Sequence, residues 1–276
     1  MKVRKPGWAA ILVGASTWAL SAQEPPRIQG QPIPSKLQVD GRLDEPAWAS
    51  AKAMTLTQQA PNPGQATAFT TTVKVLVAPE GLYLGVRCQD PDPTKIVTHT
   101  LQRDGDFSGD DVVNLVLDTL GDGHTAYLFQ VNAAGAQADG LVSGPESTSL
   151  DWDGIWEAAT TRDEQGWTAE IFIPSRTLRF NPSRPTWGLN LERFVARERV
   201  TLRWASPILD AKFPDMARAG VLDGVGVLQR GSGWSITPYF LGQQRTDFTT
   251  EHTQRLGRGG VDVTVPLGEQ LSGVFT

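Results

Sequence analysis

The feature that most constrains the fold of this chain is a pair of apolar and polar alternations at positions 71–88, TTVKVLVAPEGLYLGVRC. The apolar side chains are Val73, Val75 and Val77, followed by Leu82, Leu84, Val86 and Cys88. A period of two places these side chains on one face of a strand. The residues APEG between the two runs favour a turn. The segment therefore predicts a β-hairpin with one buried face, on which Cys88, the single cysteine, packs as a small apolar residue.

Similar runs recur along the chain, at 110–119, 125–140, 166–174 and 187–199. The first of these, DDVVNLVLDT, is apolar on both faces, which is typical of a central strand. Helical signals are confined to EPAWASAK and PSRTL, at 45–52 and 174–178. The 28 glycines and 19 prolines supply many turns. We therefore predict an all-β fold, an antiparallel, jelly-roll-like β-sandwich over residues 33–230 with one or two short helical turns.

The N-terminus predicts export. Lys2, Arg4 and Lys5 precede the apolar run 8–20, and Ala22 offers a cleavage position, so residues 1–22 have the pattern of a signal peptide. Residues 23–32 are predicted to be a flexible leader. The chain has a net charge of −5. Three of its positive charges lie in the signal peptide, so the remaining chain is more acidic. An acidic exported protein is a poor candidate for binding nucleic acid.

The pattern changes over residues 231–276. Two alternating runs, GWSITPYFLG and GVDVTVPLG, are separated by a linker rich in Gln, Arg and Thr. So short a segment cannot bury a core of its own. It either completes the sandwich or begins a second β-domain that the chain does not finish. Alternating runs of about ten residues also match the strands of outer-membrane β-barrels.

One acid-rich stretch, DGRLDEPAW at 40–48, is explained by local structure. Asp40 before Gly41 favours a turn, and Asp44 is placed to cap a short helix that has Pro46 near its start. Trp48 is spaced to fold back onto the sheet as a buried anchor.

A second group of acids leaves three interpretations open. The first is a calcium site, because calcium is bound by oxygen ligands such as carboxylates. Its candidate ligands are Asp90, Asp92, Asp104, Asp106 and Asp110. Glycoside hydrolysis needs two facing carboxyl groups; the candidates are Asp104, Asp110, Asp111 and Glu157. The third interpretation, the alternative to calcium, is that Asp104, Asp106 and Asp110 only make turns and hydrogen bonds within loops.

Aromatic residues in loops suggest a sugar-binding surface, because an aromatic face stacks on the apolar side of a pyranose. Trp152 and Trp204 are the candidates, whereas Trp48, Trp167 and Trp187 lie on apolar stripes and are expected in the core. The polar side chains that could bind sugar hydroxyls are Arg103, Asn132, Gln137, Asn190 and Arg193.

Taken in order, several pieces of the chain resemble carbohydrate-binding module family 9 over roughly residues 33–230. The pieces are VDGRLDEPAWASA, TTVKVLVAPEGLYLGVRCQDPDP, SGDDVVNLVLDT, AYLFQVNAAGAQADG, GWTAEIFIPSRTLRF and WGLNLER. The resemblance implies a β-sandwich that binds glucan or xylan-type sugars between aromatic side chains, often with bound calcium, and is commonly attached to glycoside hydrolases.

The C-terminal pieces ITPYFLGQQ and GGVDVTVPLGEQLSG are similar to the first strands of a bacterial family in which this domain precedes a predicted outer-membrane β-barrel. This resemblance implies a non-catalytic carbohydrate-binding domain at the periplasm or cell surface, tethered to the outer membrane and serving carbohydrate catabolism or uptake. A glycosidase acting on O-glycosyl bonds, and a calcium-stabilised accessory domain without a sugar ligand, are the alternatives.

Overall fold

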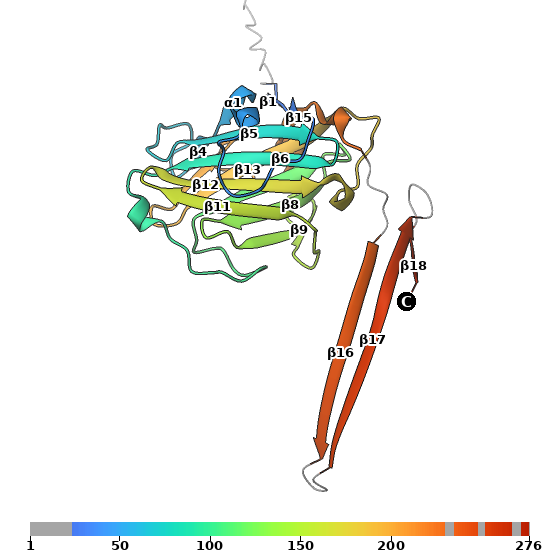
Figure 1. The fold of residues 1–276 in the computed structure, drawn as a ribbon. Coiled ribbons are helices and arrows are strands. Elements are labelled where there is room, and N and C mark those ends of the chain that lie inside the picture. The colour runs from blue at the N-terminus through green and yellow to red at the C-terminus, as the bar shows by residue number, and fades with distance from the viewer. Residues whose placement is uncertain (1–23, 230–234, 248–251, 267–271, 276) are drawn as a thin grey trace, which may run out of the picture.

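Most of the chain forms two β-sheets packed face to face (Figure 1). The computed structural model describes residues 24–229, 235–247, 252–266 and 272–275. The predicted signal peptide lies outside the described residues. The regular secondary structure of the described residues is mostly strand, as predicted, and the two packed sheets confirm the β-sandwich.

The larger sheet has nine strands. Its main order is β1 (Arg27–Gln29), β15 (Gly220–Asp223), β13 (Thr186–Val195), β7 (Val112–Asp118), β8 (Thr125–Asn132), β9 (Gln137–Ser143) and β10 (Thr148–Ser149), with β14 (Val200–Arg203) pairing β13 and β4 (Thr57–Ala60) pairing β14. The predicted central strand is therefore β7, which is buried along its whole length.

The smaller sheet has six strands. Its main order is β11 (Glu157–Asp163), β12 (Gly166–Pro174), β6 (Gly81–Gln89), β5 (Thr71–Ala78) and β2 (Gln31–Pro32), and β3 (Ala53–Thr55) also pairs with β5. The short helices are α1 (Pro46–Ser50), η1 (Pro93–Lys95), η2 (Ser175–Thr177), η3 (Met216–Arg218) and η4 (Val225–Val227). Two of them, α1 and η2, fall on the predicted helical turns.

The predicted hairpin is formed by β5 and β6, with Ala78 opposite Gly81 at the turn. Its apolar face closes the interior of the sandwich, where Cys88 is fully buried, as predicted. Trp167 and Trp187 lie in the same core. The inward faces of the two sheets thus share one apolar interior, which matches the two-layer prediction.

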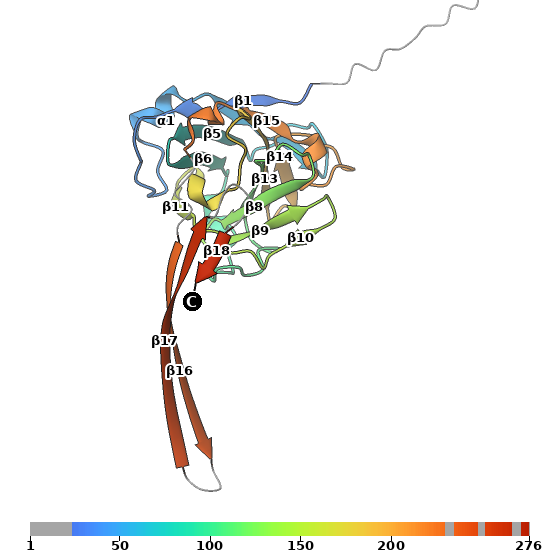
Figure 2. The same cartoon turned by 90° about the vertical axis from the view of Figure 1, so that its right-hand side faces the viewer.

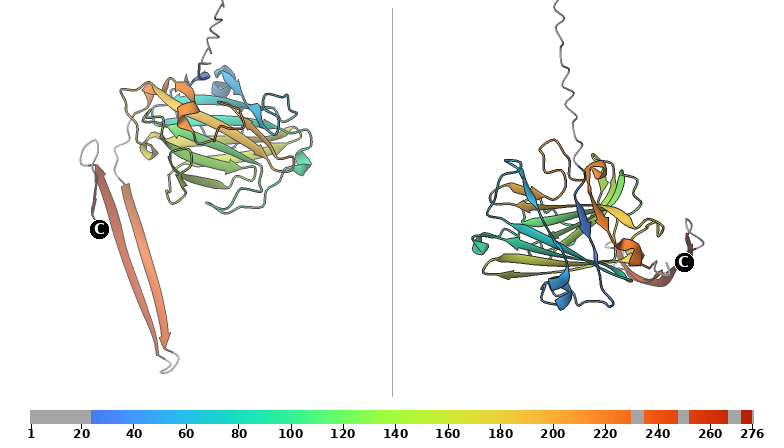
Figure 3. Two further views of the ribbon diagram at one scale, coloured as in Figure 1. Left: turned by 180° about the vertical axis from the view of Figure 1, so that it is seen from behind. Right: turned by 90° about the horizontal axis from the view of Figure 1, so that it is seen from above.

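The leader predicted for 23–32 is wrong for residues 27–32. This segment adds β1 to the larger sheet and β2 to the smaller one, both in parallel pairing, so it crosses both layers (Figure 3). Ile28 is 1% exposed in the core, and a side chain on Gly30 would lie 2.5 Å from Val77 Cγ2. Strands of two or three residues are too short to show a period.

The stretch DGRLDEPAW fastens α1 to the outer face of the smaller sheet. Trp48 is 1% exposed and packs with Leu76, Tyr83 and Phe172 there, so the predicted buried anchor is confirmed. The helix begins after Glu45 and has no side-chain cap, so the predicted capping role of Asp44 is wrong.

A third sheet contains β16 (Ser235–Asp247), β17 (His252–Pro266) and β18 (Ser272–Phe275) and lies apart from the sandwich strands (Figures 1 and 2). The predicted alternating runs fall on β16 and β17. Part of the linker expected between them belongs instead to the two strands. Gln243, Gln244 and Arg245 of β16 pair with residues 254–256 of β17 in the same antiparallel register. In the described part of the chain, none of the helices has the length and hydropathy needed to cross a membrane.

Candidate functional site

The outer face of the larger sheet carries a polar strip between two apolar clusters. Because side chains alternate along β7, Val113 and Leu115 enter the core while Val112, Asn114 and Val116 face outward. Val112 belongs to a cluster with Phe107, Ala136, Ala138 and Phe194. Val116 belongs to a second cluster with Ala126, Leu128, Val142, Met216 and Ala219. Asn114 lies between them.

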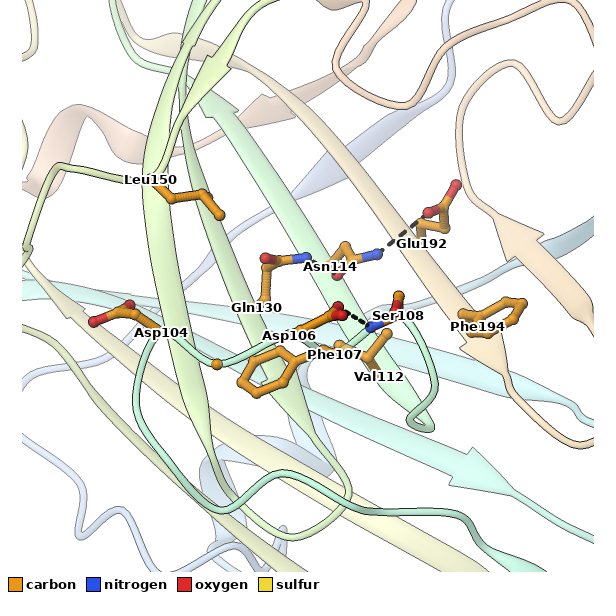
Figure 4. Close-up of a pocket in the computed structure, with 11 residues that line it drawn as sticks. Asp104, Asp106, Phe107, Ser108, Val112, Asn114, Gln130, Leu150, Glu192 and Phe194 are labelled. Carbon is orange, nitrogen blue, oxygen red and sulfur yellow. Dashed lines mark hydrogen bonds between the residues drawn. The ribbon is translucent and has the colours of Figure 1, made fainter.

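Pairing across the sheet extends this strip into a row. Asn114 stands opposite Glu192 on β13 and opposite Gln130 on β8. Asn114 Nδ2 donates to Glu192 Oε1 at 3.3 Å, and Gln130 Nε2 donates to Asn114 Oδ1 at 2.8 Å. We call these three residues the amide row (Figure 4).

The carboxylate of Glu192 fixes the direction of the amide row. A carboxylate only accepts hydrogen bonds, so Asn114 must turn its NH₂ group toward Glu192 and its oxygen toward Gln130. Gln130 must in turn present its own NH₂ group to Asn114. The amide oxygen of Gln130 is then left on the side away from the row (Figure 4).

Arg203 holds Glu192 from the other side. Its Nε and Nη2 donate to Glu192 Oε2 at 3.0 and 2.5 Å, and its Nη1 donates to the carbonyl of Ala211 at 2.7 Å. The guanidinium carbon lies 5.7 Å from the centre of the Phe213 ring. Every nitrogen of this guanidinium is therefore engaged, and its charge is matched by Glu192.

A cavity of about 540 Å³ lies over the amide row (Figure 4). One wall is the loop 104–108, and Leu150, Val112 and Phe194 supply apolar surface. We call it the outer-face pocket. Its size, its apolar rings and its few converging polar groups are typical of a site for a small organic ligand.

Arg103 joins the loops that border the pocket. Its Nη2 donates to Asp139 Oδ2 on β9 and to the carbonyl of Gly154 at 3.1 Å. Asp139 is fully buried and also accepts from Trp156 Nε1. Burial raises the pKa of Asp139, and the hydrogen bonds and the charge of Arg103 oppose that shift.

The structure brings together some of the residues predicted to bind sugar. Arg103 Nη1 and Gln137 Oε1 are 3.2 Å apart, beside the outer-face pocket but not in its lining. Trp152 packs on Tyr127 and Phe129, with ring centres 5.0 and 6.0 Å away. Trp204 is half-buried, next to Gly220. Neither tryptophan lines the pocket.

Three other predicted contacts are corrected by burial. Asn132 is 0% exposed and holds the following turn through Ala134 and Ala136. Asn190 is 2% exposed and bonds both backbone groups of Ala205. Arg193 is 0% exposed and donates to backbone and hydroxyl oxygens inside the sandwich. These side chains have no surface to offer a sugar.

The five aspartates predicted for calcium do not fit one ion. Asp90 is bound by Arg197, Asp92 pairs with Lys95, Asp106 accepts from the Ser108 amide and Asp110 is buried against His99 and Asn132. Only Asp104 belongs to a compact acidic group among the described residues, with Asp139 and Asp153. The guanidinium of Arg103 contacts all three acids and already supplies their positive charge.

The four carboxylates of the hydrolase alternative do not share a cavity either. Asp110 and Asp111 are almost fully buried, and each accepts hydrogen bonds from the backbone of 97–100. Glu157 belongs to the smaller sheet and pairs with Lys36. Asp104 alone lines the outer-face pocket. These four carboxylates therefore provide no facing pair of the kind that glycoside hydrolysis needs.

Sequence reasoning missed the amide row, Phe107 and Phe194. One signal was present: Asn114 interrupts the apolar run VVNLVLD, and a polar residue within a buried strand needs partners. Its partners stand 16 and 78 positions away and are found only through the strand register.

Comparison with solved structures finds proteins of similar fold. A protein of Bacteroides uniformis ATCC 8492 proposed to bind carbohydrate matches with a TM-score of 0.57 and 12% identity, over 72% of this chain and 99% of that one. A carbohydrate-binding module family 9 protein of Caldicellulosiruptor kristjanssonii in complex with cellotriose has a TM-score of 0.53 and 15% identity, over 75% and 95% of the two chains. Its complex with glucose matches with the same TM-score and identity, over 75% and 97%.

The search of curated proteins found no match. The family model described as carbohydrate family 9 binding domain-like matches residues 39–207, more than half of the 276-residue chain. The match covers every strand of the amide row, and it agrees with the resemblance seen in the sequence. The chain therefore belongs to the carbohydrate family 9 binding domain-like family.

Proposed function

We propose that this domain binds a saccharide in the outer-face pocket, without catalysis. The family and the cellotriose and glucose complexes of the Caldicellulosiruptor protein support a sugar ligand. An oligosaccharide with a glucan or xylan-type backbone, serving catabolism or uptake, is the proposed ligand class.

The amide row is the observation that carries the proposal. Sugar hydroxyls both donate and accept, and planar amide and carboxylate groups bind them in defined directions. The row presents such groups from three neighbouring strands, which hold their positions more firmly than loops would. Phe194 is half-buried beside the row and offers ring surface to the apolar face of a pyranose, and the buried Phe107 belongs to the same apolar cluster.

The test is calorimetric titration of the full chain with cellotriose and with xylotriose. Asn114→Ala should weaken binding about tenfold or more, because Glu192 and Gln130 both lose a partner. Asn181→Ala is the matched control, since this asparagine is exposed in a turn far from the row, and it should leave binding unchanged. A folded chain that binds neither trisaccharide, or an Asn114→Ala variant with full affinity, would contradict the proposal.

We propose further that the protein is exported and that its third sheet attaches it to the outer membrane. One face of this sheet is apolar: Ile236 and Phe240 are 67% and 80% exposed, and Ile236 stands opposite Val263. A strand of 15 residues such as β17 reaches about 50 Å, more than the roughly 30 Å of hydrocarbon in a bilayer.

Vesicle co-sedimentation tests the membrane proposal. Ile236→Arg should reduce association of the full chain with outer-membrane lipid vesicles, because a cation on a lipid-facing strand is costly. Thr237→Arg, one residue along and on the opposite face, should have little effect. Equal losses in both variants, or no association of the unmodified chain, would count against attachment through this face.

A further inference from the structure

The outer-face pocket has more hydrogen-bond acceptors than donors. All three nitrogens of Arg203 are bonded to Glu192 and Ala211, and the row consumes one N–H each of Asn114 and Gln130. Each of these two amides therefore keeps a single N–H. The free acceptors are more numerous: the oxygen of Gln130 and the remaining lone pairs of Glu192 and Asp106.

The pocket is also negatively charged. Its lining contains Asp104, Asp106 and Glu192 and, among the described residues, no lysine or arginine. Arg203 balances Glu192, and Arg103 is shared among Asp104, Asp139 and Asp153. Asp106 accepts only local hydrogen bonds from Ser108, which lower its pKa and keep it ionised. The charge that remains at the pocket is negative.

We propose that the outer-face pocket selects amino sugars, saccharides that carry a protonated amine, over neutral and acidic ones. This inference rests on the proposed saccharide site. An ammonium group donates three hydrogen bonds and accepts none, so it complements both the acceptor excess and the charge. The carboxylate of a uronic acid would meet acceptors and like charge, which opposes its binding.

Titration of the full chain with four trisaccharides tests the inference. The glucosamine trimer carries the charge, the N-acetylglucosamine trimer has the same backbone without it, cellotriose is the neutral reference, and a glucuronate trimer is acidic. At about pH 6, where the amines are protonated, the glucosamine trimer should bind about tenfold more tightly than the N-acetylated one. Raising the salt from about 0.02 to about 0.5 M should remove most of this advantage.

A pair of isosteric variants locates the effect. Asp106→Asn keeps an acceptor for the Ser108 amide and removes one charge from the lining, so the preference for the charged trimer should fall several-fold. Asp122→Asn is the control, because this aspartate makes the same kind of turn at the opposite end of β7 and β8. It should leave the preference unchanged.

The outcomes separate the inference from the function beneath it. Tighter binding of the glucosamine trimer that weakens with salt and in Asp106→Asn supports the inference. Neutral trimers that bind as well as the charged one, or a preferred glucuronate trimer, overturn it while sugar binding stands. If the folded chain binds none of the four, the saccharide site itself is wrong.

Discussion

At the scale of single residues, Asn114 shows how a polar side chain is kept within a buried strand. It is 9% exposed, and an unpaired amide at that depth costs one or more kcal/mol. Glu192 and Gln130 satisfy it from the two neighbouring strands. The row is thus maintained by its own hydrogen bonds in the absence of ligand, which is the preorganisation that tight binding needs.

Glu192→Gln tests the role of the Glu192 carboxylate, which orients the amide row and pairs with Arg203. The change leaves Arg203 buried without its counter-ion, so the free energy of unfolding should fall by about 3 kcal/mol. The same change at Glu146, in an exposed pair with Lys212, should cost less than about 1 kcal/mol. Urea denaturation of both variants is the measurement; equal losses would show that the buried pair has no special role.

Arg103→Ala tests the contact that joins the loops beside the pocket. Asp139 would remain buried without its cation, so we expect a loss of about 2 kcal/mol in the free energy of unfolding and weaker saccharide binding. Arg176→Ala, at an exposed position, is the control. Chemical denaturation and titration check the two effects, and a variant as stable as the control would refute the role given to Arg103.

At the scale of elements, α1 and the turn before it fasten the outer layer of the smaller sheet. Trp48→Ala would leave a cavity among Ile33, Leu76 and Tyr83, so the free energy of unfolding should fall by about 3–5 kcal/mol. The sugar affinity of the folded variant should not change, because this cluster lies on the smaller sheet and the amide row lies on the larger one. Loss of binding at unchanged stability would contradict the structural role.

The same turn is expected to respond to pH through Glu170. Glu170 Oε2 accepts from the amides of Asp40 and Gly41 at 3.0 and 3.2 Å, and Glu170 Oε1 and Glu45 Oε2 are buried without partners. Burial, together with the charges of Glu45 and Asp40, raises the Glu170 pKa to about 7, which the two backbone hydrogen bonds only partly oppose. The folded state therefore favours the protonated acid.

A raised acid pKa makes stability highest at low pH. The contribution of Glu170 is complete below its ordinary pKa of 4.5 and is lost as the pH rises toward about 7, by about 3 kcal/mol in all. Glu170→Gln keeps an acceptor for both amides and should remove this part of the pH dependence. Urea midpoints at about pH 5 and pH 8 measure it, and parallel pH profiles of the two proteins would contradict the assignment.

At the scale of the whole molecule, the sequence predicted the fold better than the site. Alternation located the hairpin of β5 and β6 and the central strand β7, because long buried strands have a clear period. It missed β1 and β2, which are too short for a period and are defined by parallel pairing with distant strands. The sequence also predicted a linker at positions where β16 and β17 remain paired as strands.

The site was harder to predict because it depends on the strand register, which brings side chains from three strands together. Asn132, Asn190 and Arg193 have the right chemistry but are buried as supports of turns and of the core. The aromatic signal led to Trp152 and Trp204, whereas phenylalanines line the pocket. Gln130 and Glu192 look like ordinary polar positions on their strands until β7 is placed between them.

The proposed function requires that a saccharide binds over the amide row on the outer face of the larger sheet. A crystal structure of the full chain soaked with cellotriose tests it most directly. We predict density for the sugar within hydrogen-bond distance of Asn114, Gln130 or Glu192 and against the ring of Phe194. A sugar bound instead at Trp152 or Trp204, with the outer-face pocket filled by water alone, would contradict the claim.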